Sequence, residues 1–114
     1  MTEIKLSKSC IGEAEKKAVL AVLDHEYLGM GAEVQAFEME IQEYLETDRS
    51  VICVNTGTAA LHLALQAAGV GPGDEVLVPS LTYVASYQAI SATGGIPVSC
   101  DVCDTTLTLD PDDA

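Results

Sequence analysis

Apolar residues in the first part of the chain recur at the spacing of α-helices. A helix is predicted over residues 12–26, where Ala14, Ala18 and Val22 share one face. A second helix is predicted over residues 32–46 from a longer apolar stripe on one side. That stripe consists of Val34, Phe37, Ile41, Tyr44 and Leu45.

The pattern changes after residue 50, where short apolar runs alternate with helical stretches. Strands are predicted over residues 51–54, 75–78 and 96–100, because these runs are apolar and rich in β-forming residues. Between them, residues 58–68 are nearly all Ala and Leu, which predicts a deeply buried helix, and a second helix is predicted over residues 82–93. Such alternation with short connections predicts an α/β fold with a mostly parallel sheet flanked by helices.

The chain is therefore expected to have two parts. Residues 1–49 would hold an extended arm, residues 1–10, and the two N-terminal helices, while residues 50–114 would begin an α/β domain. Asp110 and Pro111 are typical of an N-cap and first position of a further helix, and a three-stranded parallel sheet leaves an exposed edge. We expect the domain to be incomplete here and the natural chain to be longer.

Charge and hydropathy narrow the possible partners. The formal net charge is −13, from 18 acids and 5 bases, and no lysine or arginine follows Arg49. Such a chain repels a phosphate backbone, so a nucleic-acid partner is not expected. No apolar run approaches the ~20 residues that span a bilayer, and the N-terminus resembles no signal peptide. We therefore expect a cytoplasmic protein that is not bound to a membrane.

The four cysteines do not indicate a metal site. Cys100 and Cys103 form a single C-x-x-C, and neither a second pair nor a nearby histidine completes the four ligands of structural zinc. A redox C-x-x-C would open a helix, whereas this pair ends a predicted strand. Ordinary reduced thiols are expected.

The clearest candidate for chemistry is the loop after the first predicted strand, residues 55–60. Ligands of open α/β sheets bind at the carboxyl ends of the strands, where this loop lies. Gly57 permits a sharp turn, and the first amides of the following helix lack intrahelical partners and carry the positive end of its dipole. Thr58 adds a hydroxyl donor. The turn is a candidate phosphate cradle, and the alternative is an ordinary N-cap followed by a glycine turn.

A second candidate is Tyr83, which lies at the start of the next predicted helix and at the same edge of the sheet. Its ring could stack on a flat cofactor, and the alternative is a core or interface tyrosine. His25 and His62 have no acid or thiol partner at catalytic spacing, so packing or surface roles are expected for them.

Taken in order, the motifs of this chain resemble those of the DegT/DnrJ/StrS-type sugar aminotransferases, pyridoxal-phosphate (PLP) enzymes of fold type I. The resemblance implies that the chain is an N-terminal fragment, a truncated part of the large domain of such a transferase preceded by two helices. It covers almost the whole sequence and is carried by residues 28–34, 37–38, 55–61, 71–76, 79–86, 101–104 and 109–111.

The resemblance also implies roles for particular residues. Thr58 and Ala59 would bind the phosphate of PLP through their backbone amides at the Gly57 turn. Tyr83 would stack on the pyridine ring of the cofactor. Gly29 and Gly31 would lie near the site of the nucleotide-sugar substrate.

For the whole protein, the resemblance implies transfer of an amino group from an amino acid, typically glutamate, to a nucleotide-linked keto-sugar by a homodimer. The catalytic lysine that binds PLP covalently would lie beyond residue 114, so the 114-residue piece is expected to be inactive alone. Two alternatives stay open. One is a PLP-dependent sugar dehydratase of the same family, with histidine in place of that lysine. The other is a non-catalytic phosphate-binding or interaction module.

Overall fold

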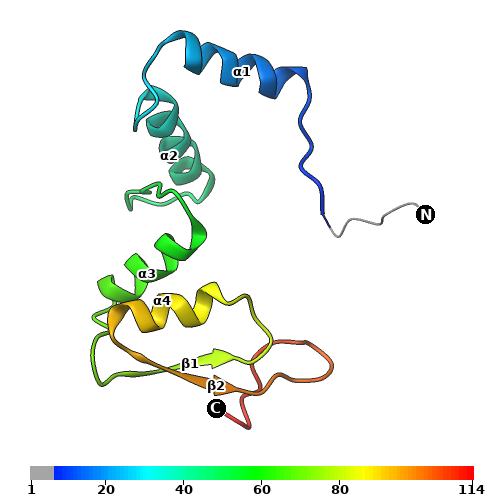
Figure 1. Ribbon diagram of the computed structural model, residues 1–114, viewed down its shortest axis with the longest axis vertical. Helices are drawn as coiled ribbons and strands as arrows, with labels where there is room; N and C mark the ends of the chain where they lie inside the picture. Colours follow the sequence, from blue (N-terminus) through cyan, green and yellow to red (C-terminus); the bar gives the residue numbers. More distant parts are fainter. Residues whose placement is uncertain (1–6) are drawn as a thin grey trace, which may run out of the picture. The chain divides into compact units, whose positions relative to one another are not determined.

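A computed structural model of the protein describes residues 7–114, and Figure 1 shows their helices and strands. These residues divide into two compact units, an N-terminal unit that ends at Cys53 and a C-terminal unit, Val54–Ala114. Of the expected extended arm, residues 7–10 form neither helix nor strand, and residues 1–6 lie outside the described range. Within that range, no helix has the length and apolar character needed to cross a membrane.

The N-terminal unit contains the two expected helices, α1 (Glu13–Asp24) and α2 (Ala32–Tyr44). Each helix is followed closely by a glutamate with left-handed backbone, Glu26 after α1 (φ 54°) and Glu46 after α2 (φ 49°). A left-handed residue cannot continue a right-handed helix, which accounts for the ends being earlier than predicted. Neither helix has a fully buried residue in this structure.

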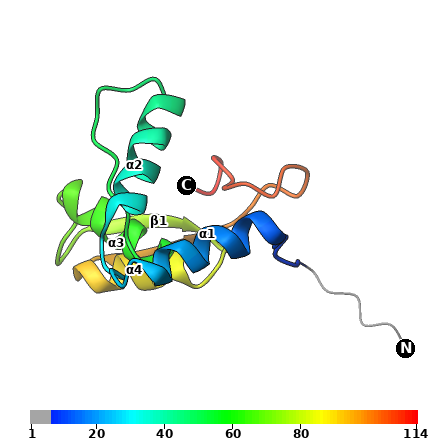
Figure 2. The same cartoon turned by 90° about the horizontal axis from the view of Figure 1, so that it is seen from above.

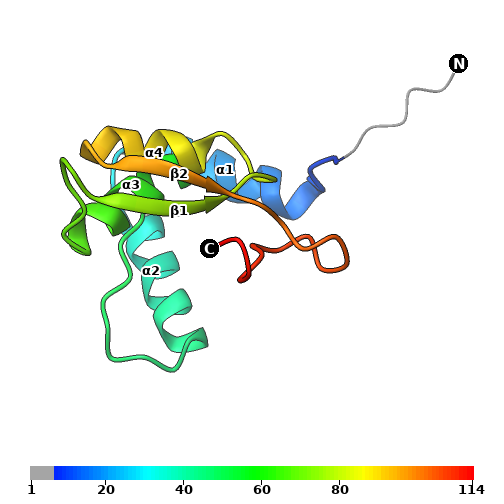
Figure 3. The same cartoon turned by 90° about the horizontal axis from the view of Figure 1, so that it is seen from below.

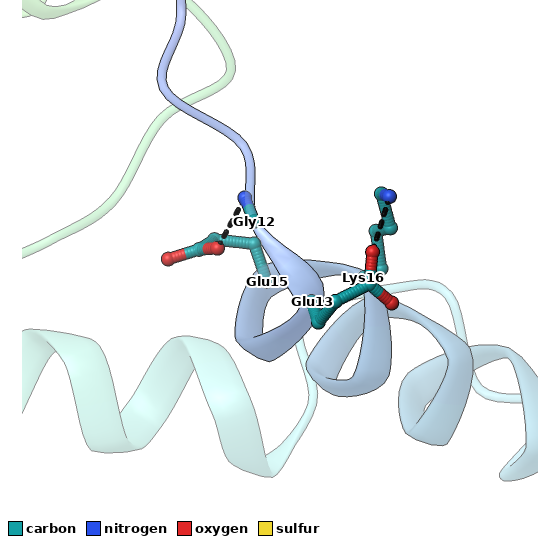
Figure 4. Close-up of polar contacts among 4 residues, drawn as sticks. All are labelled: Gly12, Glu13, Glu15 and Lys16. Carbon is teal, nitrogen blue, oxygen red and sulfur yellow. Dashed lines mark hydrogen bonds and ion pairs between the residues drawn. The ribbon is translucent and has the colours of Figure 1, made fainter.

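Polar contacts fix the first turn of α1, as Figure 4 shows. The amide of Gly12 donates to the carboxylate of Glu15 over 2.7 Å, and the ammonium of Lys16 lies 2.6 Å from the carboxylate of Glu13. The backbone amides of Glu15 itself and of Gly12 lower the pKa of the Glu15 carboxyl below its usual value. A carboxylate in this position also interacts favourably with the positive end of the helix dipole.

The C-terminal unit contains α3 (Gly57–Ala67), β1 (Glu75–Pro79), α4 (Ala85–Thr93) and β2 (Ile96–Cys100). The two strands pair in parallel, from Glu75 opposite Ile96 to Pro79 opposite Cys100. Figure 3 shows them side by side, and Figure 1 shows α4 along one face of the pair. Helix α3 packs on α4 and not on the strands, and Figure 1 shows α4 lying between α3 and the strand pair. Figure 2 shows the same elements stacked when seen from above.

The core of this unit lies between α4 and the strands. Its buried apolar side chains are Val78, Ala85, Ala89, Ile90 and Cys100. Helix α4 ends at Gly94, whose φ of 87° is the left-handed conformation that glycine adopts without strain. The expected α/β fold, with a parallel sheet flanked by helices and preceded by two N-terminal helices, is confirmed.

Two details of that prediction were wrong. Residues 51–54 form no strand, and the sheet has two strands rather than three. A strand needs a neighbouring ladder, and the amide of Cys53 instead donates to the carboxylate of Glu38 over 2.7 Å. The helix expected to be deeply buried, α3, exposes 44% of Leu61 and 50% of Leu63, because within the C-terminal unit only α4 packs against it.

The packing of α4 on the sheet predicts how the protein responds to a larger side chain at Ala89, which is 0% exposed. Ala89→Leu adds volume to a closed space and should lower the free energy of unfolding by about 1–3 kcal/mol. Ala92 is exposed on the same helix, so Ala92→Leu should change it by less than about 0.5 kcal/mol. Urea unfolding of both variants measures this difference, and equal effects would contradict the packing.

Candidate cofactor site

An open hollow of about 660 Å³ lies between the start of α3 and the start of α4. Both helices begin at the side where the carboxyl ends of β1 and β2 lie, as Figure 1 shows. The hollow therefore occupies the edge of the sheet at which ligands of α/β proteins bind. Its lining residues are Gly57, Thr58, Ala60, Leu61, Ala64, Tyr83, Ala85 and Ser86.

The start of α3 presents unpaired amides at this hollow. Thr56 is the N-cap, with extended backbone (φ −149°), and its hydroxyl accepts from the amide of Ala59 over 3.1 Å. Its carbonyl accepts from the amide of Ala60, also over 3.1 Å. The amides of Gly57 and Thr58 have no hydrogen-bond partner in the described part of the chain. Two donors at the positive end of the α3 dipole are thus available to an anion.

The space that a side chain would occupy at Gly57 is open. A Cβ atom built at Gly57 would meet no heavy atom within 4 Å, so no protein group fills that position. The described residues therefore fit an anionic group such as a phosphate, which needs both free amides and room to approach them. The side chain of Thr58 lines the same hollow.

Ala59 is placed differently from Gly57 and Thr58. Its amide is already bonded to the Thr56 hydroxyl, and it is not among the residues that line the hollow. A phosphate could accept a hydrogen bond from the Ala59 amide only if the bond from that amide to the Thr56 hydroxyl were broken. The structure thus brings Gly57 and Thr58 to the hollow as free donors, and Ala59 as a donor already in use.

Tyr83 lies in the turn between β1 and α4 and lines the same hollow as Gly57 and Thr58. Its side chain is 78% exposed, so within the described chain it is not a core tyrosine. The helix begins at Ala85 rather than at residue 82, which leaves Tyr83 in the turn before it. The ring and the free amides, which are far apart in the sequence, meet at one place.

Gly29 and Gly31 line a separate hollow of about 540 Å³ within the N-terminal unit. The ring of Tyr27 lies against this glycine segment, and a Cβ atom at Gly31 would come within 2.9 Å of its Cδ1 atom. A side chain at position 31 would therefore displace the Tyr27 ring from this position. The hollow also contains His25, whose Nδ1 lies 2.6 Å from the carbonyl oxygen of Ala21.

The hollow between α3 and α4 is unusual for an anion site because the C-terminal unit has no lysine or arginine. No lysine or arginine occurs after Arg49, so the C-terminal unit offers an anion no ammonium or guanidinium group. Among residues 7–114, no group of histidine, cysteine and acidic side chains is arranged to hold a metal ion. Any phosphate bound here would be held by the helix dipole and by hydrogen bonds from α3.

The sequence reasoning did not single out Ser86, which lines the hollow, or Thr56 and Thr82, which directly precede the lining residues Gly57 and Tyr83. Thr56 caps α3, and a threonine directly before a glycine turn and helix is a recognisable N-cap signal. Thr82 and Ser86 pair their hydroxyl oxygens over 3.1 Å, and their spacing of four residues was the available signal. Neither pattern is specific enough in a sequence to distinguish a site from an ordinary turn.

Comparison with solved structures shows the class of protein to which this arrangement belongs. DesV of Streptomyces venezuelae superposes with a TM-score of 0.78 at 48% identity, over 88% of this chain and 27% of DesV. Spr1654 of Streptococcus pneumoniae, solved in a PLP form, gives a TM-score of 0.87 at 37% identity, over 97% of this chain and 28% of that protein. The fold is that of PLP-dependent aminotransferases.

The family follows from the sequence match. The model of the DegT/DnrJ/EryC1/StrS aminotransferase family matches residues 9–114, and the chain belongs to this family. The dTDP-3-amino-3,4,6-trideoxy-alpha-D-glucose transaminase of Streptomyces venezuelae is 50% identical over 86% of this chain. GDP-perosamine synthase of Caulobacter vibrioides is 42% identical over 84%. The chain spans 26% of the length of each of these two relatives.

These comparisons confirm the family expected from the motifs. They also confirm the expected cofactor at the level of the family, because a relative has been solved in both a PLP form and a PMP form. The hollow at α3 and α4 is the place in the C-terminal unit where free amides and an aromatic ring converge.

The segment that follows β2, beginning at Asp101, gives a prediction for the thiol of Cys103. Hydrogen bonds from the Thr105 hydroxyl, the Thr105 and Thr106 amides and the Thr106 hydroxyl lower the pKa of Cys103 to about 7. Burial, followed by the neighbouring Asp113, raises the pKa of Cys100, which is 1% exposed. Iodoacetamide should alkylate Cys103 with a half-maximal rate near pH 7 and leave Cys100 unmodified.

The rate of Cys103 alkylation should rise with pH, because the thiolate is the form that reacts. Below pH 7 the Cys103 thiol is protonated and slow, and above it the thiolate reacts. Thr105→Val removes the hydroxyl that lies 3.2 Å from the sulfur and should move the midpoint upward. Peptide mass mapping over a pH series measures both midpoints. A midpoint for Cys103 above about 8.5, the value of a free thiol, would contradict this geometry.

Proposed function

We propose that the full-length protein transfers an amino group from an amino acid, glutamate, to a nucleotide-linked keto-sugar, with PLP held in the hollow between α3 and α4. The observation that carries the proposal is the convergence of the free Gly57 and Thr58 amides with the Tyr83 ring in one hollow. Two relatives support the proposal, because one is a dTDP-sugar transaminase and the other is GDP-perosamine synthase.

The residues of this chain have distinct parts in that site. The amides of Gly57 and Thr58 bind the phosphate, and the Thr58 hydroxyl adds a donor beside them. The exposed ring of Tyr83 provides a flat apolar face for the pyridine ring. When bound, PLP supplies an electron sink for the carbon from which the proton is removed. The described residues thus bind and orient, and the proposal assigns them no proton transfer.

The remaining machinery is proposed to lie in other parts of the full-length protein. A transaminase needs a lysine for covalent attachment of the cofactor and an acid beside the pyridine nitrogen. No lysine follows Lys17, so the C-terminal unit supplies no such amine. We infer that residues 1–114 alone are inactive, and that the full-length enzyme is a cytoplasmic homodimer. Gly29 and Gly31 are proposed to lie near its nucleotide-sugar substrate.

The cradle can be tested at Gly57 because a side chain there projects into empty space. Gly57→Val in the full-length protein should fold normally and weaken PLP binding at least ten-fold, or about 1.4 kcal/mol, since the new side chain blocks the phosphate. The measurement is titration with PLP followed by the visible absorption band of the bound cofactor. Bleaching of that band by glutamate reports the amino-donor reaction in the wild-type protein.

Gly71 provides the matched control. A Cβ atom there also meets nothing within 4 Å, and its backbone, like that of Gly57, is outside the left-handed region. Gly71 lies in the turn before β1, away from the hollow, so Gly71→Val should bind PLP like the wild type. Equal affinity of the Gly57 variant and the wild type, or absence of a cofactor band in wild-type protein, would rule the proposed site out.

A further inference from the structure

The turn that carries Tyr83 is closed by a pair of hydroxyl groups. The Oγ1 atom of Thr82 lies 3.1 Å from the Oγ atom of Ser86, within hydrogen-bond distance. The amide of Ser86 also donates to the carbonyl of Tyr83 over 3.0 Å. Tyr83 therefore lies inside a loop that is bonded across its ends.

This closure matters because the ring has little else to hold it. The Tyr83 side chain is 78% exposed, so packing does not fix the turn within the described chain. The N-cap of α4 is Val84, which is in helical conformation (φ −52°, ψ −24°) and has no side-chain cap. The hydroxyl pair is thus the side-chain link between the turn and the helix.

The helical end of this link is well anchored. Ala85 and Ala89 of α4 are buried, at 7% and 0% exposure, which fixes the helix against the core. Ser86 follows Ala85 directly and lines the hollow beside Gly57 and Thr58. The hydrogen bond between Ser86 and Thr82 therefore ties the turn that contains Tyr83 to a helix that is fixed against the core.

We propose that Thr82 and Ser86 are positioning residues, whose hydroxyl bond holds the Tyr83 ring at the hollow for a flat heteroaromatic ligand. This inference rests on the proposed function and names residues that act through Tyr83. Holding an exposed aromatic ring in its bound position before the ligand arrives reduces the ordering cost of binding. A single hydrogen bond of this kind corresponds to a change of about two- to ten-fold in affinity.

The test uses the full-length protein and three variants, Thr82→Val, Ser86→Ala and the double variant. Each single variant should weaken PLP binding about three- to ten-fold. The double variant should bind PLP with the same affinity as the single variant that binds it less tightly, because both substitutions break the same bond. The induced circular dichroism of the bound cofactor should fall in all three, while the melting temperature of cofactor-free protein stays at the wild-type value.

Two controls separate a positioning role from a general loss of structure. Thr106→Val breaks another hydroxyl pair, in which the Oγ1 atoms of Thr106 and Thr108 lie 2.8 Å apart away from the hollow, and should leave PLP binding unchanged. Ser86→Thr keeps the hydroxyl and should retain wild-type affinity and dichroism. If a variant at Thr82 fails to fold, the comparison of Ser86→Ala with Ser86→Thr decides the question.

The outcomes distinguish this inference from the proposed function. If wild-type protein shows no cofactor band, the proposed function fails and the positioning role fails with it. If wild-type protein binds PLP and the variants at Thr82 and Ser86 match it in affinity and dichroism, only the positioning role is overturned. The positioning role would also be overturned if the fold-loss of PLP affinity in the double variant equalled the product of the two single losses, because the two hydroxyls would then act separately.

Discussion

The parallel pairing of β1 with β2, with α4 packed along one face, determines where the other parts of the C-terminal unit lie. Parallel strands place both carboxyl ends at one edge, and the turn after β1 must therefore begin α4 there. Helix α3 packs on α4, and its first turn lines the same hollow as the start of α4. The buried side chains of Val78, Ala89 and Ile90 stabilise this arrangement, and the hollow is its consequence.

The hollow combines two kinds of recognition that do not need charged side chains. Free amides at the start of a helix attract an anion through the dipole, and an exposed ring offers a flat apolar face. This suits a ligand with a phosphate at one end and an aromatic ring at the other. The absence of lysine and arginine after Arg49 means that the positive charge of a lysine or arginine side chain would have to come from outside the C-terminal unit.

The sequence predicted what depends on local pattern. The strands β1 and β2, and the convergence of Gly57 with Tyr83, follow from apolar periodicity and from the loops at one edge of a sheet. Residues 51–54 were assigned wrongly because a strand exists only with a neighbouring ladder, which local pattern does not reveal. The depth of burial of α3 depends likewise on what packs against it. The bond that occupies the Ala59 amide depends on the side-chain rotamer of Thr56, which a sequence does not specify.

The central claim is that one ligand contacts the start of α3 and the Tyr83 ring together. A crystal structure of the full-length protein grown with PLP tests it most directly. The account predicts phosphate oxygens within about 3.2 Å of the amide nitrogens of Gly57 and Thr58, with the pyridine ring stacked on Tyr83. A phosphate bound elsewhere, or a pyridine ring that does not touch Tyr83, would contradict it.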